Sequence, residues 1–315
     1  YANHDCVRHI VRVDIATGQE TPLPGLRPGD RFAEWSPDGE RLALLTDIGN
    51  ETVVAIVERA TGSRRVLSGT GRAAAPVAWS PDGTRIVVPR HRGTVIDRSE
   101  PFRWTRPYLA ADGVGPLEDP PQLCLVDVAT GEAGWLTDDG WRWSSPQWSP
   151  DGGHVAAVTS LDPADRIGGK VLHVLDPAGI VDESLTLSGR AVVARWLDDG
   201  SLVAMVAEPA GRPGGSAAEL HVFEGGGARR VPVADLMGDV FGDCAAELAD
   251  TYDNLVIPHG RSVIVRVGAR GRLGVVVVDL DTDEVRTVLD GPRACTPVAC
   301  VGELLVFTRQ APDSY

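Results

Sequence analysis

The sequence predicts an all-β fold, a β-propeller built from four-stranded blades, and three observations predict it. The five residues Trp-Ser-Pro-Asp-Gly occur three times, and each copy is followed by a strand-like run of apolar residues. The copies recur at spacings that suit four short strands joined by hairpins, which is the unit of a propeller. The 36 glycines and 23 prolines are typical of a chain with many tight turns.

The repeated motif marks a tight turn in each predicted blade. Its proline presets φ, its aspartate can bond the turn backbone, and its glycine can take a positive φ. The four repeat tryptophans hold equivalent places, so they are predicted to be core wedges between blades and not a ligand-stacking surface. Complete copies begin at Trp35, Trp79 and Trp148, and weaker ones at Trp196, Val256 and Val298.

Strands are predicted around these turns. A strand over 123–128 ends in a turn, and a short fourth strand follows it over 133–137. A similar strand over 10–15 lies near the start of the chain. Together these segments give four short strands per repeat. Alternating apolar runs follow the first four copies of the motif, at residues 41–45, 85–88, 154–158 and 201–206.

Counting the copies predicts six blades in a single domain that spans residues 1–315. The two inner strands of the last blade come from residues 293–315, and its two outer strands from residues 7–23. Pairing the termini in this way closes the ring and leaves no open sheet edge. An incomplete seven-bladed propeller is the alternative. The predicted blades cover about 27–69, 70–139, 140–189, 190–239, 240–292, and 293–315 together with 1–26.

Charge and composition disfavour some classes of protein. With 30 basic and 44 acidic residues the net charge is −14, which argues against binding to nucleic acid or anionic lipid. No apolar run reaches the roughly 18 residues that a membrane span needs. The five cysteines form no C-x-x-C pair, which favours reduced thiols in a cytoplasmic protein. The chain begins at Tyr1 and not at Met, so a processed or trimmed N-terminus is expected.

The sequence contains no catalytic motif of a serine hydrolase. A nucleophile elbow needs Gly-x-Ser-x-Gly. The nearest segment, residues 260–264, lacks the second glycine and lies in a repeat turn. No catalytic residue is therefore predicted in this chain.

No metal and no cofactor are predicted. An N-terminal cluster is interpreted as part of a frayed terminus, with metal binding as the alternative. Three aspartates near the end of the chain are interpreted as a solvated hairpin turn, because the glycine and glutamate of a calcium loop are misplaced. The first cluster is His4, Asp5, Cys6 and His9, and the second is Asp279, Asp281 and Asp283.

Two insertions interrupt the regular spacing, and insertions of this length are usually functional or mobile. They lie near residues 91–121 and 234–253, and the second has apolar residues at roughly helical spacing, which is compatible with a short helix. Arginine suits a carboxylate or carbonyl, and aromatic rings suit apolar side chains. Non-repeating residues are thus the candidates for lining the channel and contacting substrate, with packing of the insertion as the alternative: Arg103, Trp104, Arg106, Tyr108, Trp141, Arg142 and Trp143.

Several segments resemble the propeller domain of acylaminoacyl-peptidase-like enzymes of the prolyl oligopeptidase family, and the repeat itself resembles that of TolB-type propellers. The resemblance covers essentially the whole chain and is most specific over residues 103–152. It implies a seven-bladed propeller followed by a hydrolase domain, and the present sequence departs from both features. The segments that resemble the family are 103–108, 111–115, 122–127, 135–137, 146–152, 238–243 and 304–313.

The resemblance implies a non-catalytic propeller that restricts access of short peptides to a hydrolase domain. That domain or subunit is the expected partner, and its catalytic residues would come from outside this sequence. A stand-alone TolB-like binding or scaffold propeller is one alternative. An independent enzyme with a site at the channel mouth is another.

Overall fold

The computed structural model describes the strands and turns of the chain, and every regular element in the described ranges is a β-strand. No helix there is long and apolar enough to span a membrane. Residues 94–119 of the first predicted insertion (91–121) and residues 235–253 of the second (234–253) lie outside the described residues. The described residues are 11–13, 20–49, 51–67, 71–74, 76–93, 120–160, 170–187, 189–209, 218–224, 227–234, 256–269, 272–290, 294–301 and 304–310.

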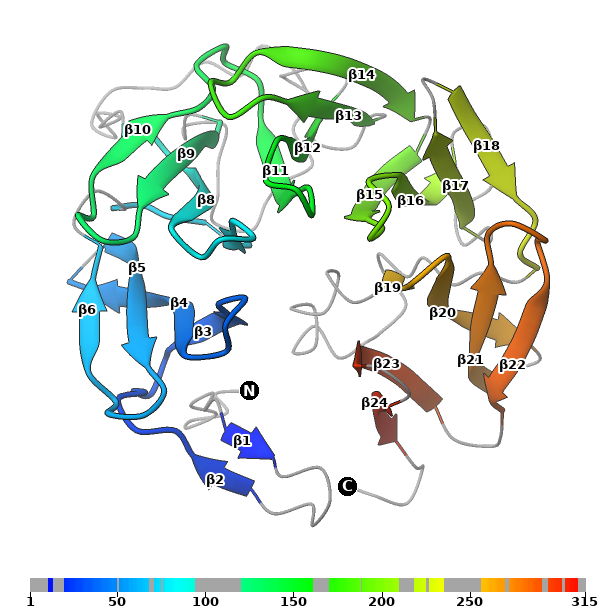
Figure 1. Cartoon of the computed structure of the whole chain (residues 1–315), viewed down its shortest axis with the longest axis horizontal. Coiled ribbons are helices and arrows are strands. Elements are labelled where there is room, and N and C mark those ends of the chain that lie inside the picture. Colours follow the sequence, from blue (N-terminus) through cyan, green and yellow to red (C-terminus); the bar gives the residue numbers. More distant parts are fainter. Residues whose placement is uncertain are drawn as a thin grey trace, which may run out of the picture. The chain divides into compact units, whose positions relative to one another are not determined.

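The chain divides into two compact units, residues 1–146 and 147–315. The first unit holds two complete sheets, in which consecutive strands pair in antiparallel fashion (Figure 1). A two-stranded sheet precedes them, formed by β1 (Val11–Val13) and β2 (Glu20–Pro22). The complete sheets are β3 (Arg31–Trp35), β4 (Arg41–Ile48), β5 (Glu51–Glu58) and β6 (Arg64–Val66), then β7 (Ala78–Trp79), β8 (Arg85–Arg90), β9 (Gln122–Asp127) and β10 (Ala133–Trp135).

The second unit continues the same pattern. Its first sheet begins with β11 (Trp143–Trp148), which crosses the boundary between the units, and continues with β12 (Val155–Ser160), β13 (Lys170–Leu175) and β14 (Val181–Leu187). The next two sheets are β15 (Gly189–Trp196), β16 (Leu202–Pro209), β17 (Glu219–Glu224) and β18 (Gly227–Val231), then β19 (Val256–His259), β20 (Ser262–Ala269), β21 (Arg272–Asp279) and β22 (Val285–Leu289). A two-stranded sheet follows, formed by β23 (Ala294–Val301) and β24 (Leu304–Gln310).

Five four-stranded antiparallel sheets confirm the predicted fold class, a β-propeller. Each sheet is made of four consecutive strands and is one blade. The two short sheets are the segments that were predicted to share a blade. Their pairing, the count of six blades and the single-domain boundaries stay predictions.

The turn motif has the same hydrogen bonds in all three complete copies. The Ser36 hydroxyl donates to Asp38 Oδ1 at 2.5 Å and accepts the Arg41 N–H at 2.9 Å. Asp38 Oδ1 also accepts the Glu40 N–H at 3.0 Å, and Gly39 has a φ of +69°. Equivalent contacts join Ser80 to Asp82 and Ser149 to Asp151. The motif therefore acts as the predicted turn, with a buried serine at its centre.

Neighbouring blades are joined by contacts of the repeat tryptophan. In the first unit the Trp79 indole N–H donates to Glu34 O at 3.1 Å, across two sheets. The Arg41 guanidinium lies over the Trp79 ring, 5.2 Å from its centroid, and donates to Gly83 O at 3.0 Å. Arg65 of the same blade donates to Val128 O of the next. Two arginines and one indole thus connect this pair of blades.

The prediction that all four repeat tryptophans are core wedges is correct for Trp79 and Trp148, which are buried. It is wrong for Trp35, whose exposed fraction is 41%. Among the described residues, no guanidinium covers the Trp35 ring as that of Arg41 covers the Trp79 ring. Trp196 is only partly buried, because it borders the cavity described below.

A buried ion pair fixes the start of β3. Asp30 accepts two hydrogen bonds from the Arg64 guanidinium, at 2.7 and 2.9 Å, and one from the Arg27 N–H at 2.7 Å. The Asp30 side chain is fully buried and that of Arg64 is 8% exposed. Burial alone would raise the pKa of Asp30, but the hydrogen bonds from Arg64, Arg27 and Thr46 outweigh it and hold the pKa below its ordinary value.

Candidate functional site

Three of the seven predicted contact residues lie in the described part of the chain, on the segment that leads into β11 and includes its first residue. Trp141 and Arg142 are partly exposed, whereas Trp143 is buried and donates its indole N–H to Asp139 at 2.9 Å. Gln122 on β9 donates to Trp141 O at 2.6 Å and so holds this segment against the sheet. The other four, Arg103, Trp104, Arg106 and Tyr108, lie outside the described residues. A role in contacting substrate stays a prediction for all seven.

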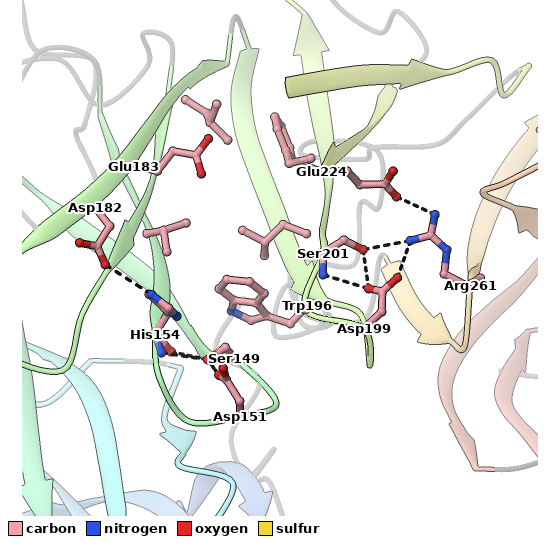
Figure 2. A pocket seen from close by; sticks show the side chains of 15 residues that line it. Ser149, Asp151, His154, Asp182, Glu183, Trp196, Asp199, Ser201, Glu224 and Arg261 are labelled. Carbon is pink, nitrogen blue, oxygen red and sulfur yellow. Dashed lines mark hydrogen bonds and ion pairs between the residues drawn. The ribbon is translucent and has the colours of Figure 1, made fainter. Parts of the chain in front are cut away.

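The second unit contains a cavity of about 730 Å³ that the sequence analysis did not identify. It lies between the β11–β14 blade and the β15–β18 blade, and Arg261 from the β19–β20 turn borders it (Figure 2). Binding sites for small ligands commonly have volumes of about 300 to 1,000 Å³. Its lining residues are Ser149, Asp151, His154, Val174, Asp182, Glu183, Leu185, Trp196, Asp199, Gly200, Ser201, Leu202, Phe223, Glu224 and Arg261.

One wall of the cavity is apolar and rigid. Trp196 donates its indole N–H to Gln147 O at 3.1 Å, which fixes the ring at the end of β15. Leu202 and Phe223 are paired across β16 and β17, and both are buried. Val174 and Leu185 face them from the other blade. An apolar group or a flat cation can therefore rest against the indole.

Arg261 closes one side of the cavity through a network of carboxylates. Its guanidinium lies 2.6 Å from Asp199, 2.6 Å from Glu224 and 2.7 Å from Asp281. Hydrogen bonds that the guanidinium donates to Asp281 and Glu224 raise the pKa of Arg261 above its ordinary value. The pKa of Asp199 is lowered, chiefly by the hydroxyl of Ser201. Arg261 is thus a permanent cation whose charge is already shared among three anions.

The opposite side carries carboxylates with few partners. Asp182 lies 3.4 Å from His154 Nε2. Glu183 is exposed and makes no side-chain hydrogen bond or ion pair with the residues that the structure describes. Figure 2 shows Glu183 and Trp196 bordering the same space between the blades. Five carboxylates line the cavity against one arginine, so its charge favours a cation.

Ser149 and His154 of the cavity do not form a nucleophile and base. The Ser149 hydroxyl donates to Asp151 at 2.5 Å and accepts the backbone N–H of His154, not its ring. The ring of His154 lies toward Asp182. An activated serine needs its hydroxyl within hydrogen-bond reach of the histidine ring. Ser149 is therefore not placed to be activated by the His154 ring.

Among the described residues, no group of three or more His, Cys, Asp or Glu side chains is placed to hold a metal ion. The cluster His4, Asp5, Cys6 and His9 lies outside them. Asp279 accepts the N–H groups of Asp281 and Thr282 at 3.0 and 2.9 Å, in the turn between β21 and β22. The interpretation of that segment as a hairpin turn is therefore confirmed.

No protein-family model and no curated protein matches the chain significantly. Solved structures do match its fold. Acylaminoacyl peptidase from Pyrococcus horikoshii is 15% identical, with a TM-score of 0.56 over 85% of this chain and 41% of the peptidase. TolB from Acinetobacter baumannii is 16% identical, with a TM-score of 0.51 over 90% of this chain and 59% of TolB. An oligogalacturonate lyase in complex with manganese is 14% identical, with a TM-score of 0.58 over 96% and 83%.

These comparisons establish the class of fold. The chain has the fold of the propeller domains of TolB and of acylaminoacyl peptidase, as the resemblance of its repeats implied. It spans 41% of the peptidase and 59% of TolB. Identities of this size show the fold alone, and propellers of this fold serve proteins with different activities.

Proposed function

We propose that this chain is the non-catalytic propeller of a peptidase of the prolyl oligopeptidase type, and that it limits access of short peptides to a serine hydrolase domain. The hydrolase would be a further part of the same protein or a separate subunit, in the cytoplasm. The observation that carries the proposal is the match of 85% of the chain to the propeller domain of acylaminoacyl peptidase. The resemblance of residues 103–152 to the same family supports it.

The arrangement of Ser149 and His154 is consistent with a propeller that does not itself hydrolyse peptides. The serine is bonded within its turn, and the histidine ring lies toward Asp182. A gating domain needs only a shaped passage and groups that contact the substrate. The candidates for such contacts are Trp141, Arg142 and the residues of the first insertion.

A fluorophosphonate probe, which labels active serine hydrolases, tests the proposal in the organism that makes this protein. An antibody against the propeller would isolate the native protein, and the probe would then be applied. We expect a labelled serine hydrolase, either in the same polypeptide or in a subunit that is isolated with it. The purified 315-residue chain should not be labelled. Labelling of that chain, or the absence of any labelled hydrolase, would overturn the proposal.

A stand-alone binding propeller is the second candidate. The match to TolB over 90% of this chain favours it, as does a cavity suited to binding. It predicts that the native protein ends without a hydrolase domain and co-purifies with no labelled hydrolase. The same probe experiment therefore separates the two candidates.

A further inference from the structure

In the first unit, Arg41 and Arg65 reach from one blade to the next. The cavity in the second unit occupies the equivalent place between two blades. Strand register establishes the equivalence on the side of the earlier blade. In the first unit Ala43 pairs with Ile56, which pairs with Arg65. In the second unit Ala156 pairs with Val174, which pairs with Glu183. Counted from the repeat tryptophan, Arg41 corresponds to His154 and Ala43 to Ala156. His154 and Glu183 thus stand where the first unit has Arg41 and Arg65.

The later blade of each pair shows the same equivalence. Trp79 and Gly83 correspond to Trp196 and Gly200, four residues apart in both copies. The turn backbone also has the same hydrogen bond in both copies. The Gly83 N–H donates to Ser80 O at 2.8 Å, and the Gly200 N–H donates to Leu197 O at 3.0 Å.

The indole contacts support the equivalence. Each tryptophan donates to a carbonyl of the preceding blade at 3.1 Å, Glu34 O for Trp79 and Gln147 O for Trp196. The receiving side of the junction is therefore alike in the two units at the indole ring and in the turn backbone that ends at the glycine. The side chains that reach across the junction from the earlier blade are different in the two units.

The second unit therefore has the indole and the glycine of a guanidinium site, but no arginine at the position of Arg41. In the first unit the Arg41 guanidinium stacks on the indole and donates to the glycine carbonyl. In the second unit the indole of Trp196 and Gly200 both line the cavity. The shorter His154 lies beside Asp182, and Glu183 replaces the second arginine with an anion.

We propose that this cavity binds the arginine side chain of a peptide. The guanidinium would stack on Trp196 and donate to Gly200 O, as Arg41 does at Trp79 and Gly83. The carboxylates of Asp182 and Glu183 would supply the anionic partners, and Leu185 and Val174 would pack against the aliphatic stem. Arginine suits this arrangement better than lysine, because its planar group can stack on a ring and donate in several directions at once.

The cavity is large enough for more than the side chain itself, which favours a peptide over free arginine. The inference goes beyond the proposed function and does not depend on it. A propeller of either kind, with or without a hydrolase, could hold an arginine here. The binding experiment uses the 315-residue chain alone, so its failure would leave the hydrolase proposal untouched.

Calorimetric titration with three capped tripeptides tests the proposal, with arginine, lysine or citrulline as the central residue. Citrulline keeps the size and planarity of arginine but carries no charge. We expect saturable binding of one arginine peptide per chain, weakened about tenfold or more for citrulline, in line with loss of a charge-assisted contact. Free arginine should bind more weakly than the peptide, and added salt should weaken both.

Two variants place the binding in this cavity. His154→Arg restores the residue of the first unit, so its own guanidinium should occupy the site and abolish peptide binding without unfolding the chain. Glu183→Gln should weaken binding about threefold to tenfold, as expected for one ionic contact at a partly exposed site. Glu284→Gln, an exposed carboxylate in the β21–β22 turn, is the matched control and should bind like the parent chain.

Three results would each overturn the proposal. The first is no saturable binding of the arginine peptide at millimolar concentration. The second is equal binding of the lysine or citrulline peptide. The third is unchanged binding by His154→Arg in a protein whose circular dichroism and thermal unfolding match the parent chain.

Discussion

The side chains of the turn motif are held by short polar networks, and the residues of each network are close together in the sequence. In the complete turn motifs, a buried serine hydroxyl satisfies both an aspartate and a backbone N–H. In the second copy these bonds lower the pKa of Asp82 from 3.8 to about 2, with the Ser80 hydroxyl as the largest cause. The motif is thus a polar structure as well as a turn of suitable backbone shape.

Removing the serine hydroxyl should lower the stability of the folded protein. Ser80→Ala leaves Asp82 with fewer partners and the Arg85 N–H without its acceptor, so we expect the free energy of unfolding to fall by about 1–3 kcal/mol. Urea unfolding measures the change, and carbon NMR should show the pKa of Asp82 moving up toward 3.8. Ser63→Ala is the control, because hydrogen bonds at Ser63 involve its backbone. An unchanged pKa of Asp82 would contradict the assignment.

The ion pair between Asp30 and Arg64 should be far more important to stability than a pair at the surface. Asp30→Asn leaves the Arg64 guanidinium buried without an anion, so we expect a loss of about 3–5 kcal/mol. Asp47→Asn, which breaks the exposed pair with Arg31, should cost about 1 kcal/mol or less. Urea midpoints of the two variants make the comparison, and equal losses would contradict the argument.

The same pair gives a direction for the pH dependence. The pKa of Asp30 is lower in the folded state than its ordinary value of 3.8, so the folded state favours the anion. The stabilisation is therefore fully present above about pH 4 and is lost as the pH falls through the folded-state pKa. The difference in stability between the parent chain and Asp30→Asn should shrink below pH 4. A difference that stays constant to lower pH would show that the charge of Asp30 is not responsible.

At the scale of elements, the strands could be predicted because their signals are local. The predicted strands over 123–128 and 133–137 are observed as β9 and β10, and the run at 154–158 as β12. Alternation of apolar residues and the turn motif both act within a few positions, so one sequence carries them in full.

The cavity could not be predicted in this way, because it depends on side chains that face each other from two blades. Its position follows from strand registers such as Val174 with Glu183, which no local pattern contains. One signal was present in the repeats. The residue six positions after the repeat tryptophan is Arg41 and Arg85 in the first two copies, and His154 in the third. A loss of a repeated arginine marks a junction that differs from the others.

A contact between two loops holds the first complete blade together. Gly62, in the turn between β5 and β6, lies against the loop before β3, and an added Cβ would lie 2.6 Å from Pro24 Cβ and 2.9 Å from Gly25 N. Its φ is +68°, close to the +69° of Gly39, where an added Cβ would meet nothing within 4 Å. Substitution of Gly39 should therefore cause backbone strain alone, whereas substitution of Gly62 should cause the same strain and a steric clash.

We expect Gly39→Ala to cost about 1–2 kcal/mol, the usual strain of a left-handed alanine. Gly62→Ala should cost about 1–3 kcal/mol more, because the methyl group must displace the neighbouring loop. Thermal and urea unfolding of both variants measure the difference. Equal losses would show that the loop before β3 moves away freely.

At the scale of the whole molecule, we predict that the two ends of the chain close the ring by sharing one blade. If residues 7–23 complete a blade with β23 and β24, deleting residues 1–23 removes the strands that cover the outer edge of β24. We expect hydrogen exchange in β23 and β24 to speed up strongly in the shortened chain, while β15–β18 keeps its protection. Unchanged exchange in β23 and β24 would favour the incomplete seven-bladed alternative.

The donor and the acceptor of the indole contact between blades have a fixed order along the chain. In both observed contacts the acceptor precedes the donor in the chain, since Glu34 comes before Trp79 and Gln147 before Trp196. During synthesis the chain emerges from its N-terminus, so each new blade meets a carbonyl that has already left the ribosome. The blades that begin near Trp79 and Trp196 can therefore dock in the order of translation, each tryptophan onto the blade made just before it.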